Sequence, residues 1–457
     1  MTAGYQYPPG SCLVFNRKVS DERIQILGAA TALGLVMSAA AFADSNNAYV
    51  DQSGDYNSAL ITQGGSGNEA GKQGRVVRQT SNEKTGADRI NRLTIAQGGD
   101  NNKVGLGANG LSLSQGDGVI QLKNYLPDPQ NNLGGYNTID INQATNSNVI
   151  GAISQYTATH LGGNSLTVRQ EGGDGNQIAK VMQYRTQTTT NEATVTQDGD
   201  GNVLQALRQV ARNAGNKNTI TATFNGDGNG ANPMTGAFSV AAGAASSEIN
   251  QGVDINTSIY NSNVNVLISG DNNAFGVTQV GGLSKLQFVA NLSVLGSENQ
   301  TAIYQGGTHQ TASLTVDGSY NDVGIRQLGS TNGGVVTVTG NDNNLGLLQN
   351  GSGNLATINL FGDGNNVGAL SGAAAIAGLT TGLVSPLGNG NTATLTVGTL
   401  AASDGNRFGV LQSGDDNTAT ATVSGGDGNQ FGISQVGSDN VASLTQTGSF
   451  NVAGISQ

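Results

Sequence analysis

An eleven-residue pattern recurs along the chain and can be written Asn-x-apolar-x-apolar-x-Gln-x-Gly-x-x-Asn. Residues 440–446 and 451–457 show it twice in succession, with Gly448-Ser449-Phe450 between them. Because side chains alternate between the two faces of a strand, the Asn, both apolar residues and the Gln share one face. A unit this short cannot bury that face alone, so copies of the unit must stack on one another. The pattern predicts a repeat protein whose function follows from stacking.

The strands occur in pairs, so one coil of the chain reads strand, turn, strand, turn. Asn137 and Asn164 belong to a series with a 27-residue period, and Asn299 and Asn321 to a series with a 22-residue period. One strand of a coil is rich in Thr, and the other often has Gly at its fourth position. Large residues on one strand facing small residues on the other would fill a narrow interior. We therefore predict an all-β fold, a two-sided β-solenoid with coils of 22–27 residues.

The composition agrees with a thin interior that is partly lined by amides. Of 457 residues, 70 are Gly, none is Trp and 11% are charged, whereas an ordinary globular domain has about 25% charged residues. The net charge of −11 is dispersed, which disfavours nucleic acid as a partner. Proline cannot donate a hydrogen bond to a strand neighbour, and no Pro interrupts a strand from Asn to Gln. The prolines lie in the leader or in irregular segments: Pro8, Pro9, Pro127, Pro129, Pro233 and Pro386.

Residues 1–43 are interpreted as a signal peptide. Basic residues precede an apolar run that begins at residue 24, and Ala41 and Ala43 form the small-x-small site, which makes Asp44 the first mature residue. A membrane anchor is the alternative, but the run is short and rich in Ala. Cys12 lies in this leader, so the mature chain contains no cysteine and no disulfide.

Two repeat blocks are predicted, at 44–229 and 263–457. An Ala/Gly-rich irregular insertion at 230–262 separates them, and a further loop is expected near 366–390. Segment 103–135 also breaks the pattern. We interpret these segments as long loops or imperfect coils, and hinges between stacked blocks are the alternative.

In-register stacking would place Asn above Asn and Gln above Gln at the strand spacing of about 4.8 Å. The side-chain amides could then form hydrogen bonds along the stack, and a slipped register would leave them unpaired at about 1–3 kcal/mol each. At three positions Gln comes one place late (Gln155, Gln183 and Gln209), which indicates bulges. The residues predicted to form the stacking and polymerisation ladder are Asn57, Gln63, Asn191, Gln197, Asn406, Gln412, Asn429, Gln435, Asn440, Gln446, Asn451 and Gln457.

The ends of such a stack expose strand edges that can template another chain. The sequence enters the pattern at Asn46, directly after the predicted leader, and reaches Gln457 within a complete copy of it. No charged or Pro-rich capping unit is visible at Gln457, whereas solenoids that stay monomeric usually have one. We therefore expect end-to-end polymerisation.

These repeats resemble the curlin repeat of curli-type fibre subunits, for example in 57–63 and 191–197. The resemblance covers roughly 44–229 and 263–457. It implies a secreted amyloid subunit that passes an outer-membrane pore and forms fibres for adhesion and biofilm matrix at the surface of a Gram-negative bacterium. The implied partners are copies of the chain and a curli-type secretion apparatus, with a shorter curlin-like subunit as a further candidate. The chain is longer than a typical five-repeat curlin, so a nucleator or scaffold role stays open.

No enzyme, cofactor, metal site or small-molecule substrate is predicted. His160 and His309 are isolated, and the acidic residues lie in turns. The run 172–177 resembles a calcium-binding β-roll, but it has Gln at the sixth place and the period is eleven rather than nine. The alternative function is a secreted monomeric solenoid that binds ice or another surface. Its candidate contacts are the outward Thr pairs Thr194/Thr196, Thr392/Thr394 and Thr418/Thr420.

Overall fold

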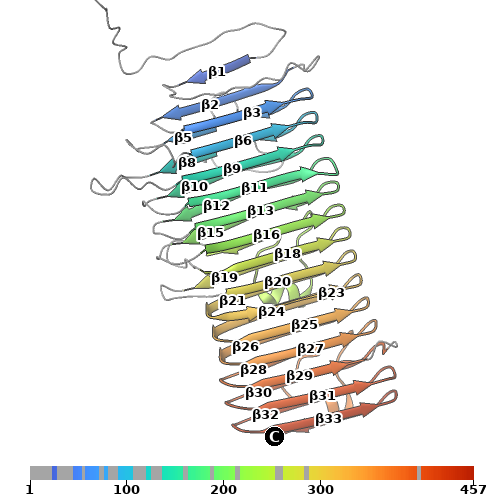
Figure 1. The fold of residues 1–457 in the computed structure, drawn as a ribbon. Coiled ribbons are helices and arrows are strands. Elements are labelled where there is room, and N and C mark those ends of the chain that lie inside the picture. The colour runs from blue at the N-terminus through green and yellow to red at the C-terminus, as the bar shows by residue number, and fades with distance from the viewer. Residues whose placement is uncertain are drawn as a thin grey trace, which may run out of the picture. The chain divides into compact units, whose positions relative to one another are not determined.

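The protein consists of two compact units, Met1–Thr219 and Ile220–Gln457, and each of them is a β-solenoid (Figure 1). In each unit the strands alternate between two sheets, named here sheet A and sheet B, and every strand pairing is parallel among the residues described. The predicted two-sided β-solenoid is therefore confirmed. The computed structural model describes residues 23–27, 45–53, 57–71, 77–80, 91–105, 120–124, 136–157, 163–185, 190–211, 217–252, 261–281, 288–398 and 403–457.

The first unit contributes ten described strands to sheet A and five to sheet B, and β16 (Lys217–Asn225) crosses the division between the units. In sheet A they are β1 (Arg23–Leu27), β2 (Asn47–Ser53), β4 (Glu69–Ala70), β5 (Val77–Thr80), β7 (Lys103–Val104), β8 (Ile120–Asn124), β10 (Val149–Thr157), β12 (Gln177–Arg185), β14 (Val203–Leu204) and β15 (Ala206–Ala211). In sheet B they are β3 (Asn57–Gln63), β6 (Asn91–Gln97), β9 (Tyr136–Gln143), β11 (Gly163–Glu171) and β13 (Thr190–Asp198).

The second unit has the same arrangement. Its sheet A contains β17 (Glu248–Gln251), β19 (Ala274–Gly281), β21 (Gln300–Thr308), β24 (Asp322–Ser330), β26 (Asn344–Ser352), β28 (Leu383–Leu387), β30 (Arg407–Ser413), β32 (Gln430–Val436) and β34 (Val452–Ser456). Its sheet B contains β18 (Asn263–Ser269), β20 (Phe288–Leu295), β22 (Gln310–Ala312), β23 (Val316–Asp317), β25 (Gly333–Thr339), β27 (Leu355–Phe361), β29 (Thr392–Val397), β31 (Thr418–Ser424) and β33 (Val441–Thr447).

The interior between the sheets is thin and alternates with the strand period. In β31 the small residues Ala419 and Ala421 are buried, while their neighbours along the strand are partly exposed. In sheet A, Phe408 and Phe431 are buried in successive coils, and their ring centroids lie 5.4 Å apart with an interplanar angle of 12°. Stacking like residues in this way lets each coil repeat the packing of the coil before it.

The turns take left-handed backbone conformations. In the turn 362–365, Gly362 has φ 101° and Gly364 has φ 65°. Glycine adopts these angles without a steric cost, which explains why the turns recur as Gly-Asp-Gly-Asn.

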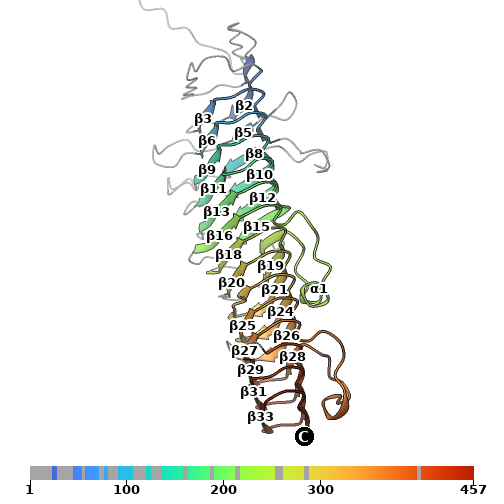
Figure 2. The same cartoon turned by 90° about the vertical axis from the view of Figure 1, so that its right-hand side faces the viewer.

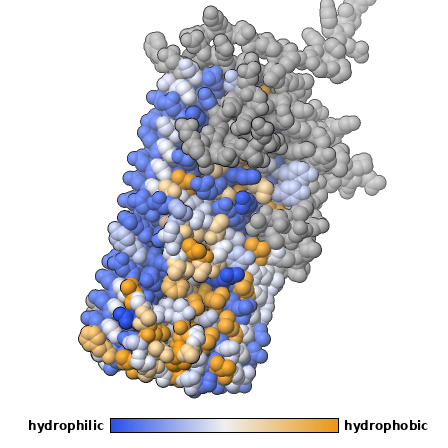
Figure 3. Space-filling view, turned by 180° about the vertical axis from the view of Figure 1, so that it is seen from behind, coloured by the Kyte–Doolittle hydropathy of each residue, from blue (hydrophilic) through white to orange (hydrophobic). Residues whose placement is uncertain are grey.

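The two irregular segments of the second unit fold back over the outer face of its sheet A, where the first carries α1 (Ala237–Ala242) and the second η1 (Gly372–Ala374) (Figure 2). Figure 3 shows apolar residues gathered on this side of the molecule. Neither segment is irregular throughout: β17 lies inside the predicted insertion 230–262, and β28 inside the predicted loop 366–390. The prediction that Pro386 lies in an irregular segment is wrong, because Pro386 belongs to β28 and is in register with Gln412 of β30.

Polar residues on the outer face of sheet A bind the backbone of these two segments. The Asp322 carboxylate accepts hydrogen bonds from the N–H groups of Phe238 and Ser239, both at 2.8 Å. The Gln430 side-chain oxygen accepts one from the N–H of Ser371 at 2.9 Å. Each of the two segments is therefore held against sheet A by its own hydrogen bonds.

Glycine at the fourth position of the repeat, counted from its Asn, makes room for the two covering segments. A β-carbon at Gly324 would collide with the carbonyl oxygen of Phe238, and one at Gly432 with that of Ala374. The backbone of the cover thus lies where a side chain would otherwise stand. The same holds, with different covering atoms, at Gly276, Gly409 and Gly454.

We expect Gly324→Ala to destabilise the second unit by about 1–3 kcal/mol, because the added methyl group overpacks the contact with α1. Limited proteolysis should then cleave within 230–247 faster than in the unchanged protein. Gly333→Ala is the matched control, since its β-carbon would meet only the ends of two side chains, Leu355 Cδ1 at 3.0 Å and Thr311 Oγ1 at 3.5 Å. Equal proteolysis of both variants would show that the glycine does not accommodate the cover.

The predicted leader lies largely outside the described residues, and so do its cleavage residues Ala41, Ala43 and Asp44. Of 1–43, only β1 is described, and it pairs with β2. Segment 103–135 is described at 103–105 and 120–124, which include β7 and β8. None of the helices in the described part of the chain has the length and apolarity needed to cross a membrane.

Candidate functional site: the buried amide ladders

A ladder of asparagines runs along the corner where the strands of sheet A begin. Asn321 donates from its backbone N–H and from its Nδ2 to Oδ1 of Asn299, both at 3.0 Å, and its Nδ2 also reaches the carbonyl of Gly340 at 2.9 Å. Each amide thus ties one coil to the next and also holds a turn. In the first unit the ladder comprises Asn46, Asn68, Asn102, Asn148, Asn176 and Asn202. In the second it comprises Asn229, Asn273, Asn299, Asn321, Asn343, Asn365, Asn406, Asn429 and Asn451.

A second asparagine ladder follows the strands of sheet B. In the first unit the side chains bond directly, as from Asn191 Nδ2 to Asn164 Oδ1 at 3.0 Å. In the second unit the backbone joins in, and Asn440 donates from its N–H and its Nδ2 to Asn417 Oδ1, at 3.1 and 2.9 Å. The side chain of the predicted ladder residue Asn57 lies outside the described part.

The glutamines form ladders in which the direction of donation is reversed. Gln327 Nε2 donates forward to Gln349 Oε1 at 2.8 Å and across the interior to the carbonyl of Thr311 at 2.7 Å. The side chains of Gln327 and Gln349 are buried, so their hydrogen bonds replace those they would make to water. The bonded Gln pairs are 63–97, 97–143, 143–170 and 170–197 in sheet B, and 155–183, 183–209, 279–305, 305–327, 327–349, 412–435 and 435–457 in sheet A.

The structure thus brings the predicted ladder residues together, with two qualifications. Asn57 is not described beyond its backbone register with Asn91. Gln446 has no Gln neighbour, since it is in register with Val423, and its Nε2 instead donates to the carbonyl of Gln430 at 3.0 Å.

Each glutamine that follows a gap in a ladder keeps a buried oxygen without a hydrogen-bond partner among the described residues. The oxygens are Oε1 of Gln155, Gln412 and Gln446. The register positions before them hold Leu122, Pro386 and Val423, which offer no amide donor. Because donation runs forward along the chain, a missing Gln leaves the acceptor of the next coil unpaired. This directionality could have been suspected from the sequence only at the gaps themselves.

The late glutamines Gln155, Gln183 and Gln209 follow an interruption in the strand pairing. Pairing between β12 and the following coil stops after Ile178 and resumes at Val181, so that β14 and β15 are separate strands. All three side chains return to the interior and are fully buried. The register is the same on both sides of the interruption, so the extra residue recurs in successive coils and the ladder stays intact.

The turns carry stacked carboxylates. Asp404 Oδ1 accepts the N–H of Asp363 at 2.9 Å, and Asp427 Oδ1 accepts that of Asp404 at 3.0 Å. The nearby charge of Glu298, to which the Tyr320 hydroxyl donates at 3.3 Å, raises the pKa of Tyr320. No group of three or more potential metal ligands occurs in the described ranges.

Strands β33 and β34 have a neighbour on one side only among the described residues, namely β31 and β32. The N–H of Thr418 donates to the carbonyl of Asn440 in the next coil, at 2.8 Å, and that of Gln430 to Asn451 at 2.7 Å. In β33 and β34 the residues in register with these donors are Val441 and Val452, whose N–H groups point away from the stack. This edge of backbone donors, with the ladder amides beside it, is the candidate functional site.

Residues 43–71 match the family model described as the curlin associated repeat. The match supports assignment of the chain to the curlin-repeat family, which is structural rather than enzymatic. No curated protein matches the chain.

Proposed function

We propose that the protein is a structural subunit whose copies stack coil on coil into curli-like amyloid fibres. The observation that carries this proposal is the in-register amide ladder, whose Asn residues continue to Asn440 and Asn451 and whose Gln residues in sheet A continue to Gln457. A second copy of the chain can continue the same Asn and Gln hydrogen bonds together with the backbone ones. Stacking between copies then repeats the contact that already joins coils within each unit.

The proposal extends to where and with what the subunit assembles. The curlin repeat supports secretion through an outer-membrane apparatus and assembly at the cell surface, where the fibres serve adhesion and biofilm matrix. The main partner is another copy of the chain, and a shorter curlin-like subunit would fit the same ladder if it presented Asn and Gln in the same register.

Purified protein beginning at Asp44 is expected to form fibres that bind amyloid dyes. Aligned fibres should give a meridional X-ray reflection near 4.7–4.8 Å, because successive coils lie one strand spacing apart. Electron microscopy and dye fluorescence over days provide the measurement. Protein that stays soluble and monodisperse over that time would contradict the proposal.

The Thr-rich outer face of sheet B supports a second candidate function, the binding of ice or another surface by the soluble protein. Thr392, Thr394 and Thr396 of β29 are in register with three threonines of β31, and all are at least partly exposed. Such a face presents hydroxyl groups at the strand spacing in one direction and at two residues in the other. Freezing hysteresis of the monomer would support this function, and its absence would exclude ice as the surface.

A further inference from the structure

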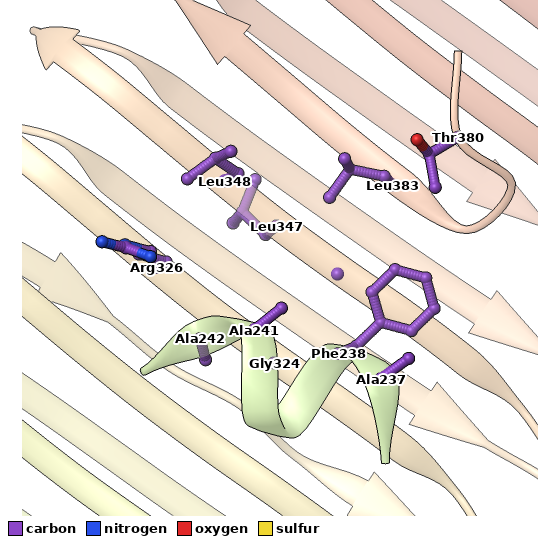
Figure 4. Close-up of a pocket in the computed structure, with 11 residues that line it drawn as sticks. Ala237, Phe238, Ala241, Ala242, Gly324, Arg326, Leu347, Leu348, Thr380 and Leu383 are labelled. Carbon is purple, nitrogen blue, oxygen red and sulfur yellow. The ribbon is translucent and has the colours of Figure 1, made fainter. Parts of the chain in front are cut away.

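A cavity of about 430 Å³ lies on the outer face of sheet A in the second unit, between α1 and the segment that leads into β28 (Figure 4). Its volume is within the range of small-molecule sites. The wall from α1 consists of Ala237, Phe238, Ala241 and Ala242. The remaining lining residues are Gly324, Arg326, Gly346, Leu347, Leu348, Thr380 and Leu383.

Two residues of the cavity floor, Gly324 and Gly346, have no side chain, so α1 lies close against sheet A. A β-carbon at Gly346 would collide with the ring of Phe238 and lie 3.1 Å from Leu383 Cδ1. The α1 wall is held in place through the Asp322 contacts and through Gln300, whose side-chain oxygen accepts the N–H of Gly236 at 2.6 Å. On the other side, the carbonyl of Gly382 accepts the N–H of Gly346 at 2.8 Å, so both walls are tied to sheet A.

Arg326 is the one charged residue of the lining. Its guanidinium carbon lies 5.6 Å from the centroid of the Tyr304 ring. Its Nε is buried and has no hydrogen-bond partner among the described residues, and no ion pair joins it to any of them. In a chain with a net charge of −11, a cation left without a carboxylate is an unused site for an anion.

We propose that this cavity binds a small monocarboxylate with an apolar tail, such as a medium-chain fatty acid. Figure 4 places Arg326 at one end of the lining and Phe238, Thr380 and Leu383 at the other, with Leu347, Leu348 and Ala241 between them. The carboxylate accepts hydrogen bonds from the Arg326 guanidinium, and the tail lies against the side chains of Leu347, Leu348 and Phe238. The site belongs to a single unit and does not depend on fibre assembly.

Titration calorimetry of the full soluble protein with octanoate tests this proposal. Arg326→Gln is expected to weaken binding about tenfold or more, because a charge-assisted hydrogen bond is lost. Ala241→Leu should abolish binding by filling the cavity. Arg92→Gln is the matched control, an exposed arginine on β6 in the other unit, and should bind octanoate as the unchanged protein does.

Octanol separates the role of the charge from that of the apolar walls, and it should bind at least about tenfold more weakly than octanoate. Equal binding of the two compounds, or no octanoate binding by a protein with an unchanged β-sheet circular dichroism spectrum, would overturn the proposal. So would an equal loss of affinity in Arg326→Gln and Arg92→Gln.

Discussion

Gln327→Leu is expected to lower the free energy of unfolding of the second unit by about 3 kcal/mol. The substitution removes the donor to Gln349 Oε1 and to the carbonyl of Thr311, and the side chain of Gln349 is fully buried. A buried polar atom left without a partner costs about 1–3 kcal/mol, and Leu restores neither bond. Gln305 loses its forward acceptor but keeps its bond to the carbonyl of Val289 at 3.2 Å.

Gln446→Leu is the matched control, because the Gln ladder is interrupted there by Val423, the residue in register with Gln446. Gln446 Oε1 has no partner among the described residues, so the substitution removes an unpaired oxygen together with a single bond to the Gln430 carbonyl. We expect a change of about 1 kcal/mol or less. Urea unfolding of both variants under conditions that prevent assembly, with unchanged m-values, measures the difference. Losses of equal size would show that the ladder adds nothing beyond burial.

The inward positions of the repeat were predictable from the sequence. Asn, the two apolar residues and Gln recur with period two, and that period alone assigns them to one face. Stacking them in register then follows from the size of the unit, since nothing else could cover the face. Phe408 and Phe431, for example, lie above one another as the repeat requires.

The roles of the outward positions were not predictable, because the contacts of these residues are made with segments distant in the sequence. Asp322 and Gln430 occupy unspecified places of the pattern, yet they anchor the two covering segments. The sequence alone does not explain why Gly recurs at 324 and 432. The backbone of 230–247 and 366–382, which folds back against these positions, leaves no room for a side chain. A period of two assigns each residue to one face of the strand, but it does not indicate what packs against that face.

Pro386 shows how a local rule fails in a stack. Its missing N–H argued for a loop, but β28 is paired on both sides. The register with β26 includes Leu383, Val384 and Leu387 and omits Ser385 and Pro386, whereas the register with β30 includes Pro386. The strand therefore tolerates proline by giving up pairing on one side, and Gln412 then lacks its donor.

The double variant Val441→Pro, Val452→Pro is expected to reduce fibre elongation by about tenfold or more, measured as dye fluorescence after addition of preformed unchanged seeds. Both residues are first in their strands, where proline is tolerated, and both direct their N–H away from the stack. The substitutions therefore remove donors that a second copy needs without removing a hydrogen bond inside the chain. Stability of the monomer should be nearly unchanged.

Val367→Pro, Val436→Ser is the control for a general loss of exposed apolar surface, since these valines lie outside the first positions of β33 and β34 and are 49% and 64% exposed. Elongation in this control should match that of the unchanged protein. If the edge variant also elongates at the unchanged rate, copies do not add through β33 and β34. The fold would be intact in that case, so the result would not contradict the solenoid architecture. It would show that assembly uses another surface.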